Sequence, residues 1–75
     1  METVLWSYEW DDGSRLELVD SPDAFVLYEY DAEGTLVKYS YRDGYSLDWA
    51  DSVSYPKARF KLEQAIADIE DEYEL

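Results

Sequence analysis

Residues 3–20 read TVLWSYEWDDGSRLELVD, two β-rich runs separated by Asp11-Asp12-Gly13. These three residues are typical of a hairpin loop in which the glycine adopts a positive φ. A loop of this length pairs Trp6 with Leu18 across the hairpin, so both side chains share one face. The stretch therefore predicts two antiparallel strands with a common apolar face.

Further turn signals divide the residues that follow. Proline, glycine and aspartate, which favour turns, gather at Ser21-Pro22-Asp23, Asp31-Ala32-Glu33-Gly34 and Asp43-Gly44. The predicted strands between the turns are 3–10, 14–20, 24–30, 35–42 and 45–49. Because each connection is short, we predict an antiparallel β-meander of four to five strands.

The end of the chain has helical periodicity. Ser54 is a predicted N-cap, and Pro56 suits the first helical turn. Apolar residues recur on one helix face at Ala58, Leu62, Ala65, Ile66, Ile69 and Tyr73. We predict one C-terminal α-helix at 55–72, packed on one face of the sheet. The chain is thus expected to be a single small acidic α+β domain over 1–75, with the meander in 1–50.

The loop lengths also predict which side chains the helix covers. A four-residue loop at 31–34 pairs Tyr28 with Val37. The predicted covered face comprises Trp6, Tyr8, Leu16, Leu18, Val26, Tyr28, Val37 and Tyr39. The predicted hydrophobic interface on the opposite face consists of Leu5, Phe25 and Leu27. Because the third run is apolar on both sides, the sequence leaves open which side of it the helix covers.

Charge decides the kind of partner. Nineteen Asp and Glu residues face six Lys and Arg residues, a formal net charge of −13 on 75 residues. Binding to nucleic-acid phosphates requires Lys and Arg, and anionic membrane surfaces repel such a chain, so neither is an expected partner. We expect a basic protein as the partner, a nucleic-acid-binding protein or nuclease that the negative field attracts from a distance. Like-charge repulsion is also expected to raise the pKa of several carboxyl groups.

The predicted helix is charged against its own dipole. Lys57, Arg59 and Lys61 stand near its start, while acidic residues crowd its end, where the dipole favours cations. We interpret the acidic residues at the C-terminus of the predicted helix as a surface for the basic partner. The cations near its start also suit pairing with carboxylates of the sheet. The carboxylates predicted to bind the partner are Glu9, Asp11, Asp12, Glu17, Glu29, Asp31, Glu33, Asp68, Glu70, Asp71 and Glu74.

The residue types needed for common catalysis are missing. The chain contains no His and no Cys, which removes the usual general base near neutral pH and the thiol nucleophile. The acidic runs lack the spacing of a Ca²⁺-binding loop. We therefore expect no enzymatic activity, no cofactor and no metal site. The lack of Cys is consistent with a cytoplasmic location, and no apolar run approaches the length of a membrane span.

In size and charge the chain resembles the small acidic inhibitors that phages and mobile elements use against restriction or CRISPR nucleases. Alternate carboxylates on a strand lie about 6.6 Å apart, close to two phosphate steps of one DNA strand. The leading hypothesis is therefore an inhibitor that mimics nucleic acid. An immunity protein or antitoxin for a basic nuclease, and a housekeeping domain of a salt-loving organism, remain alternatives. A homodimer is compatible with all of them.

Overall fold

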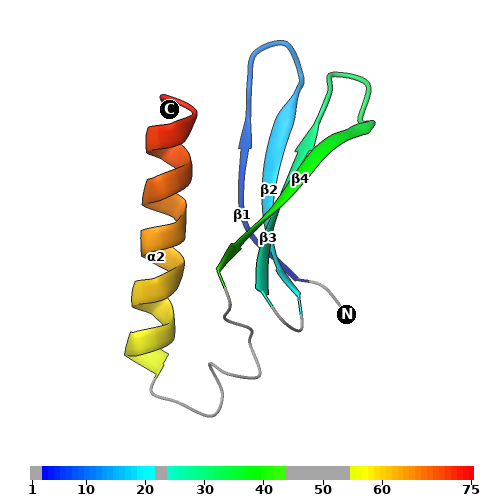
Figure 1. Cartoon of the computed structure of the whole chain (residues 1–75). Coiled ribbons are helices and arrows are strands. Elements are labelled where there is room, and N and C mark those ends of the chain that lie inside the picture. Colours follow the sequence, from blue (N-terminus) through cyan, green and yellow to red (C-terminus); the bar gives the residue numbers. More distant parts are fainter. Residues whose placement is uncertain (1–2, 22–23, 44–54) are drawn as a thin grey trace.

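The computed structural model describes residues 3–21, 24–43 and 55–75. Four antiparallel strands form one sheet in the order β1-β2-β3-β4, and a single helix follows (Figure 1). The elements are β1 Thr3–Glu9, β2 Arg15–Ser21, β3 Ala24–Tyr30, β4 Leu36–Asp43 and α2 Tyr55–Glu72. The predicted α+β meander with one C-terminal helix is confirmed. The predicted strand at 45–49, the Ser54 cap, and Pro22, Asp23 and Gly44 of the predicted turns lie outside the described residues.

The two hairpin loops share one hydrogen-bonding pattern. In the first, the Trp10 amide donates to the Ser14 carbonyl (N···O 2.8 Å) and the Gly13 amide donates to the Trp10 carbonyl (3.0 Å). The loop at 31–35 repeats these two hydrogen bonds at 2.9 and 3.0 Å. Gly13 and Gly34 have φ values of 94° and 86°, which side chains rarely permit. The positive φ predicted for Gly13 is confirmed.

Strand register agrees with the sequence in one hairpin and differs in the other. Trp6 lies opposite Leu18, as predicted. In the β3–β4 hairpin Tyr28 lies opposite Tyr39 rather than Val37, because the loop is longer and the register shifts beside Tyr30. The displacement is two residues, so Tyr28 and Tyr39 still share a face.

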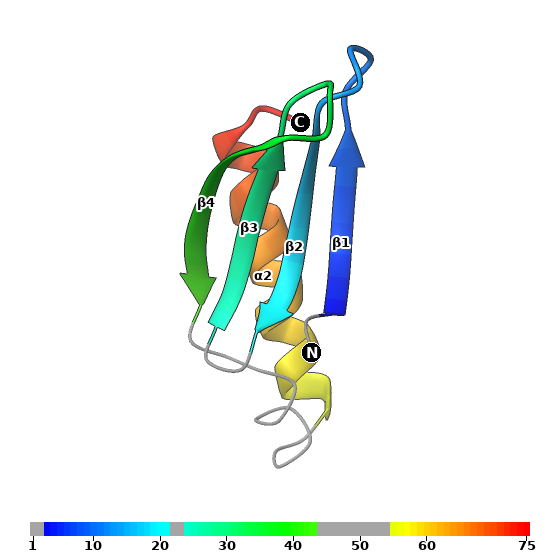
Figure 2. The ribbon, with the colours of Figure 1, turned by 90° about the vertical axis from the view of Figure 1, so that its right-hand side faces the viewer.

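The helix covers one face of the sheet, and the core lies between them (Figure 2). Leu16 and Leu18 of β2 lie in the core, and Leu27 of β3 lies opposite Leu18 in the register. The buried cluster consists of Leu16, Leu18, Phe25, Leu27, Ala65 and Ile69. Partly buried side chains around it are Leu5, Trp6, Trp10, Leu62, Ile66 and Tyr73. The helix therefore contributes an apolar stripe with the predicted spacing of three and four residues.

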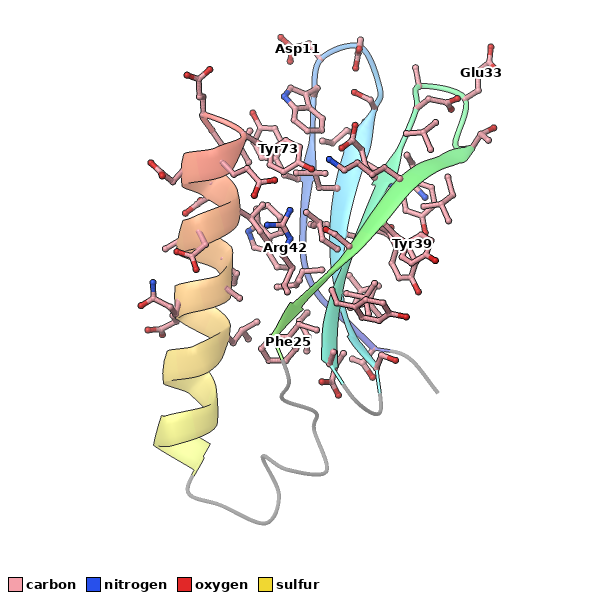
Figure 3. All side chains as sticks on the ribbon, viewed as in Figure 1. Asp11, Phe25, Glu33, Tyr39, Arg42 and Tyr73 are labelled. Atoms are coloured by element: carbon pink, nitrogen blue, oxygen red, sulfur yellow. The ribbon has the colours of Figure 1, made fainter. Side chains whose placement is uncertain are left out.

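The predicted covered face is correct for β2 and wrong for β3 and β4. Phe25 and Leu27, predicted to form an exposed interface, are 5% and 1% exposed and lie in the core (Figure 3). Leu5 packs against the same core. Ser21 pairs with Ala24, so Leu27 falls opposite Leu18 and must share its face. Val26, Tyr28 and Tyr39 consequently lie on the other face.

Matched leucine substitutions test this assignment of faces. Leu27→Ala should lower the free energy of unfolding by about 2–5 kcal/mol, because it opens a cavity in the core. Leu36→Ala, at an exposed position of β4, should change it by about 0.5 kcal/mol or less. Urea unfolding followed by circular dichroism measures both. Equal losses in the two variants would contradict the assignment.

Candidate functional site

Three segments of the chain lie at the same end of the molecule: the loop after β1, the loop after β3 and the end of α2 (Figures 1 and 2). The two loops touch, since a Cβ placed on Gly13 would lie 3.6 Å from the Ala32 carbonyl oxygen. We call this region the acidic end and define it by the carboxylates of Asp11, Asp12, Asp31, Glu33, Glu70, Asp71 and Glu74. All of these residues were predicted from the sequence to bind a partner.

Two carboxylates of the acidic end hold its loops together. Asp12 Oδ1 accepts hydrogen bonds from the Ser14 amide (2.8 Å) and the Ser14 hydroxyl (2.6 Å). Asp31 Oδ1 accepts from the amides of Glu33 and Thr35, both at 2.9 Å. Aspartate favours such local hydrogen bonds with the backbone two residues on. Asp12 and Asp31 therefore have a structural role, which their exposed neighbours at the loop tips do not share.

An ion pair and a tyrosine fix the end of α2 to the sheet. Arg42 of β4 donates two hydrogen bonds to Glu72, Nη1 to Oε1 at 2.7 Å and Nη2 to Oε2 at 2.8 Å. The Tyr73 hydroxyl donates to Glu29 Oε1 at 3.1 Å, and its ring centre lies 6.2 Å from that of Trp10. Arg42 and Tyr73 both lie between helix and sheet in Figure 3. The sequence analysis missed this anchor because its partners are 30 and 44 residues apart.

The anchor sets the pKa shifts of its own groups. The hydrogen bonds from Arg42 hold the pKa of Glu72 below its ordinary value of 4.5, and Glu72 raises the pKa of Arg42. Burial, and then the hydrogen bond to Glu29, raise the pKa of Tyr73. The pKa of Asp12 is also lowered, by its hydrogen bonds with Ser14. At Asp12 and Glu72 the expectation that repulsion raises carboxyl pKa values is wrong, because hydrogen bonds favour the charged form.

The remaining predicted carboxylates lie outside the acidic end. Glu29 accepts its hydrogen bond between sheet and helix. Glu17 accepts from Arg15 Nε at 3.0 Å, and Glu9 lies opposite Arg15 in the register. Asp68 accepts from the Gln64 side chain at 3.3 Å on the exposed side of α2. The loop and helix-end carboxylates thus lie at one end of the molecule, while Glu29, Glu17 and Asp68 are engaged by other side chains.

A second surface, which the sequence analysis missed, lies on the face of the sheet that α2 leaves uncovered. Tyr30, Tyr28, Tyr39 and Tyr41 form a connected set there in this order, with ring centres 6.4, 6.4 and 6.2 Å apart for successive neighbours. We call these four residues the tyrosine face. Tyr39 and Tyr41 are 58% and 73% exposed. A prediction of a two-residue connection between the second and third strands would have placed Leu18 opposite Leu27. That register would have revealed this face from the sequence.

The tyrosine face carries a shallow depression and, beside it, an arginine side chain that packs on one of the rings. The depression has a volume of about 290 Å³ and is lined by Ser21, Val26, Tyr28, Leu36, Tyr39 and Tyr41. Beside it, the guanidinium carbon of Arg15 lies 4.2 Å from the centre of the Tyr30 ring. Arg15 also pairs with Glu17. One arginine is thus held jointly by an aromatic ring and a carboxylate.

Comparison of the chain with protein-family models, with curated proteins and with solved structures gave no match. Among the side chains that the structure describes, no three from His, Cys, Asp or Glu are placed to hold a metal ion together. The helix in this part of the chain lacks the apolar length that crossing a membrane requires.

The contribution of the helix anchor can be measured with a double-mutant cycle. Arg42→Met and Glu72→Gln should show a coupling of about 1 kcal/mol in urea unfolding at neutral pH, because the pair is bidentate but partly exposed. The folded-state pKa of Glu72 is lowered, so its contribution is present above the ordinary pKa of 4.5 and is lost as pH falls through the lowered value. Glu70→Gln removes the same charge without breaking the pair. If it destabilises as much as Glu72→Gln, the anchor has no special role.

Salt should stabilise the fold. Raising NaCl from about 0.01 M to about 1 M shortens the Debye length from about 30 Å to about 3 Å and screens the repulsion of a chain at −13. We expect the melting temperature to rise by about 5 °C, measured by circular dichroism. The variant Asp11→Asn/Glu33→Gln should show a smaller rise. A flat salt dependence would contradict the expectation, and folding only in molar salt would favour adaptation to a saline cell.

Proposed function

We propose that this protein is a small acidic inhibitor that binds a basic nucleic-acid-binding protein and occupies the groove meant for a nucleic-acid backbone. The observation that carries the proposal is the acidic end, where two hairpin loops and a helix terminus that all carry carboxylates lie at the same end of the molecule. Carboxylates and phosphates are both anions that accept charge-assisted hydrogen bonds from Lys and Arg. A groove lined by those residues would therefore bind the acidic end in competition with nucleic acid.

The helix dipole supports this use of the acidic end. No basic residue stands in the last turn of α2 and no acidic residue in its first turn. The aligned peptide dipoles of α2 have their negative end at this terminus and therefore add a partial negative charge to the carboxylates around it. This arrangement destabilises an isolated helix, yet it concentrates negative potential at one end of the molecule. A concentrated field of this kind speeds association with a cationic surface.

Rigidity also supports the proposal. The loop hydrogen bonds of Asp12 and Asp31 and the Arg42–Glu72 pair fix the segments that carry the exposed carboxylates. A surface held in place before binding loses less conformational freedom when the partner docks. The inhibitor would act by binding alone, without catalysis. We place its action in the cytoplasm, which suits a chain without cysteine.

Capture from a lysate of the source cells tests the proposal. The immobilised protein should retain a basic nucleic-acid-binding protein that elutes with salt and is identified by mass spectrometry. Added duplex DNA should release it, because both ligands occupy the same groove. With the purified partner, Asp11→Asn/Glu33→Gln should slow association about tenfold, as expected when steering charges are removed.

A variant with the same change in net charge provides the control. Thr3→Lys/Glu63→Gln also adds two positive units, at the start of β1 and within α2, away from the acidic end. It should leave the association rate close to that of the unaltered protein. The proposal fails if no basic protein is retained, if DNA does not displace it, or if both variants slow association equally.

A further inference from the structure

The tyrosine face is an unusual surface for so acidic a chain. Tyr39 and Tyr41 project from β4 away from α2, and Figure 3 shows Tyr39 on the side opposite Phe25 and Arg42. Their rings meet edge to face at an interplanar angle of 89°. Within the described residues, no cation lies over either ring. Two large aromatic side chains are therefore available to a ligand.

Arg15 shows what chemistry this face accepts. Its guanidinium lies over Tyr30 at 4.2 Å, and Glu17 accepts its Nε hydrogen bond at 3.0 Å. Glu17 lies opposite Tyr28, which in turn lies opposite Tyr39. The carboxylate and the exposed ring thus belong to one cross-strand row. The row carries its carboxylate on β2, and on β3 and β4 it carries rings of the kind that Arg15 contacts at Tyr30.

The spacing of the exposed rings matches an extended peptide. The ring centres of Tyr39 and Tyr41 are 6.2 Å apart. Alternate side chains of an extended chain lie about 6.6 Å apart, on the same side. Arginines separated by one residue would therefore each meet one ring.

Charge decides between candidate occupants of the face. A second copy of this chain carries the same −13 and would be repelled. A cationic segment is attracted by the same field. Arginine suits the rings better than lysine, because its planar guanidinium stacks on an aromatic face while donating hydrogen bonds at its edge.

We propose that the tyrosine face binds an extended segment of the partner in which arginine alternates with another residue. This inference rests on the proposed function, since it assigns a second contact to the same basic partner. The acidic end attracts the partner by charge, and the tyrosine face selects arginine by stacking.

A short peptide that alternates glycine and arginine, acetylated and amidated at its ends, is the probe. Titrated into the labelled protein at about 0.15 M NaCl, where exposed charges are largely screened beyond about 8 Å, it should shift the NMR signals of Tyr28, Tyr39 and Tyr41. Tyr39→Leu/Tyr41→Leu should weaken its affinity about five- to thirtyfold. Tyr39→Phe/Tyr41→Phe, which keeps both rings, should retain the affinity. The lysine counterpart of the peptide should bind more weakly.

Tyr8→Leu is the matched control, since Tyr8 is an exposed tyrosine of β1 whose ring contacts Trp10 instead. It should leave peptide affinity unchanged. The inference is overturned if the leucine double variant binds the peptide as well as the unaltered protein, or if the Tyr8 variant loses as much. Such a result leaves the proposed function standing when Asp11→Asn/Glu33→Gln still slows association with the captured partner. Failure to capture any basic protein would instead remove the proposed function, while the peptide titration still decides the chemistry of the face.

Discussion

The pairing of Leu18 with Leu27 across β2 and β3 is the constraint on which the rest of the structure depends. Ser21 pairs with Ala24, and this register places the apolar side chains of the two central strands on the same face. That face is the one apolar enough to hold α2, so the position of the helix follows from the register. The same pairing places Val26 and Tyr28, the alternate residues of β3, on the opposite face of the sheet. The core and the tyrosine face are therefore two results of one alignment.

Local patterns carried most of the fold. The loop glycines, the register of the first hairpin and the bounds of α2 all follow from signals that lie close together in the chain. The faces of β3 could not be predicted in the same way, because that strand is apolar on both sides and its own sequence does not distinguish them. The predicted β3–β4 register was wrong for a related reason. The loop is one residue longer than predicted and the register shifts beside Tyr30, and neither feature is evident in the sequence.

Of the two candidate surfaces, only the acidic end could be predicted from local sequence patterns. The acidic end was predictable, since turns and a helix terminus are recognisable from sequence and charged residues at such places are exposed. Which carboxylates are free to act was not predictable. Asp12 and Glu29 are engaged by Ser14 and Tyr73, contacts that depend on loop geometry in one case and on helix docking in the other. The tyrosine face could not be predicted, because its position follows from the β2–β3 register, which the sequence left open.

The hairpin loops separate what holds them from what they display. Beside their backbone hydrogen bonds, the carboxylates of Asp12 and Asp31 accept hydrogen bonds within the loops, and the glycines that follow adopt the positive φ angles. Asp11 and Glu33 stand at the tips with exposed side chains, and Glu33 takes part in this bonding only through its backbone amide. Substitution at the tips would thus alter what the loops present while the scaffold beneath persists. These two positions can therefore change the charge and shape of one end of the molecule without a cost to folding.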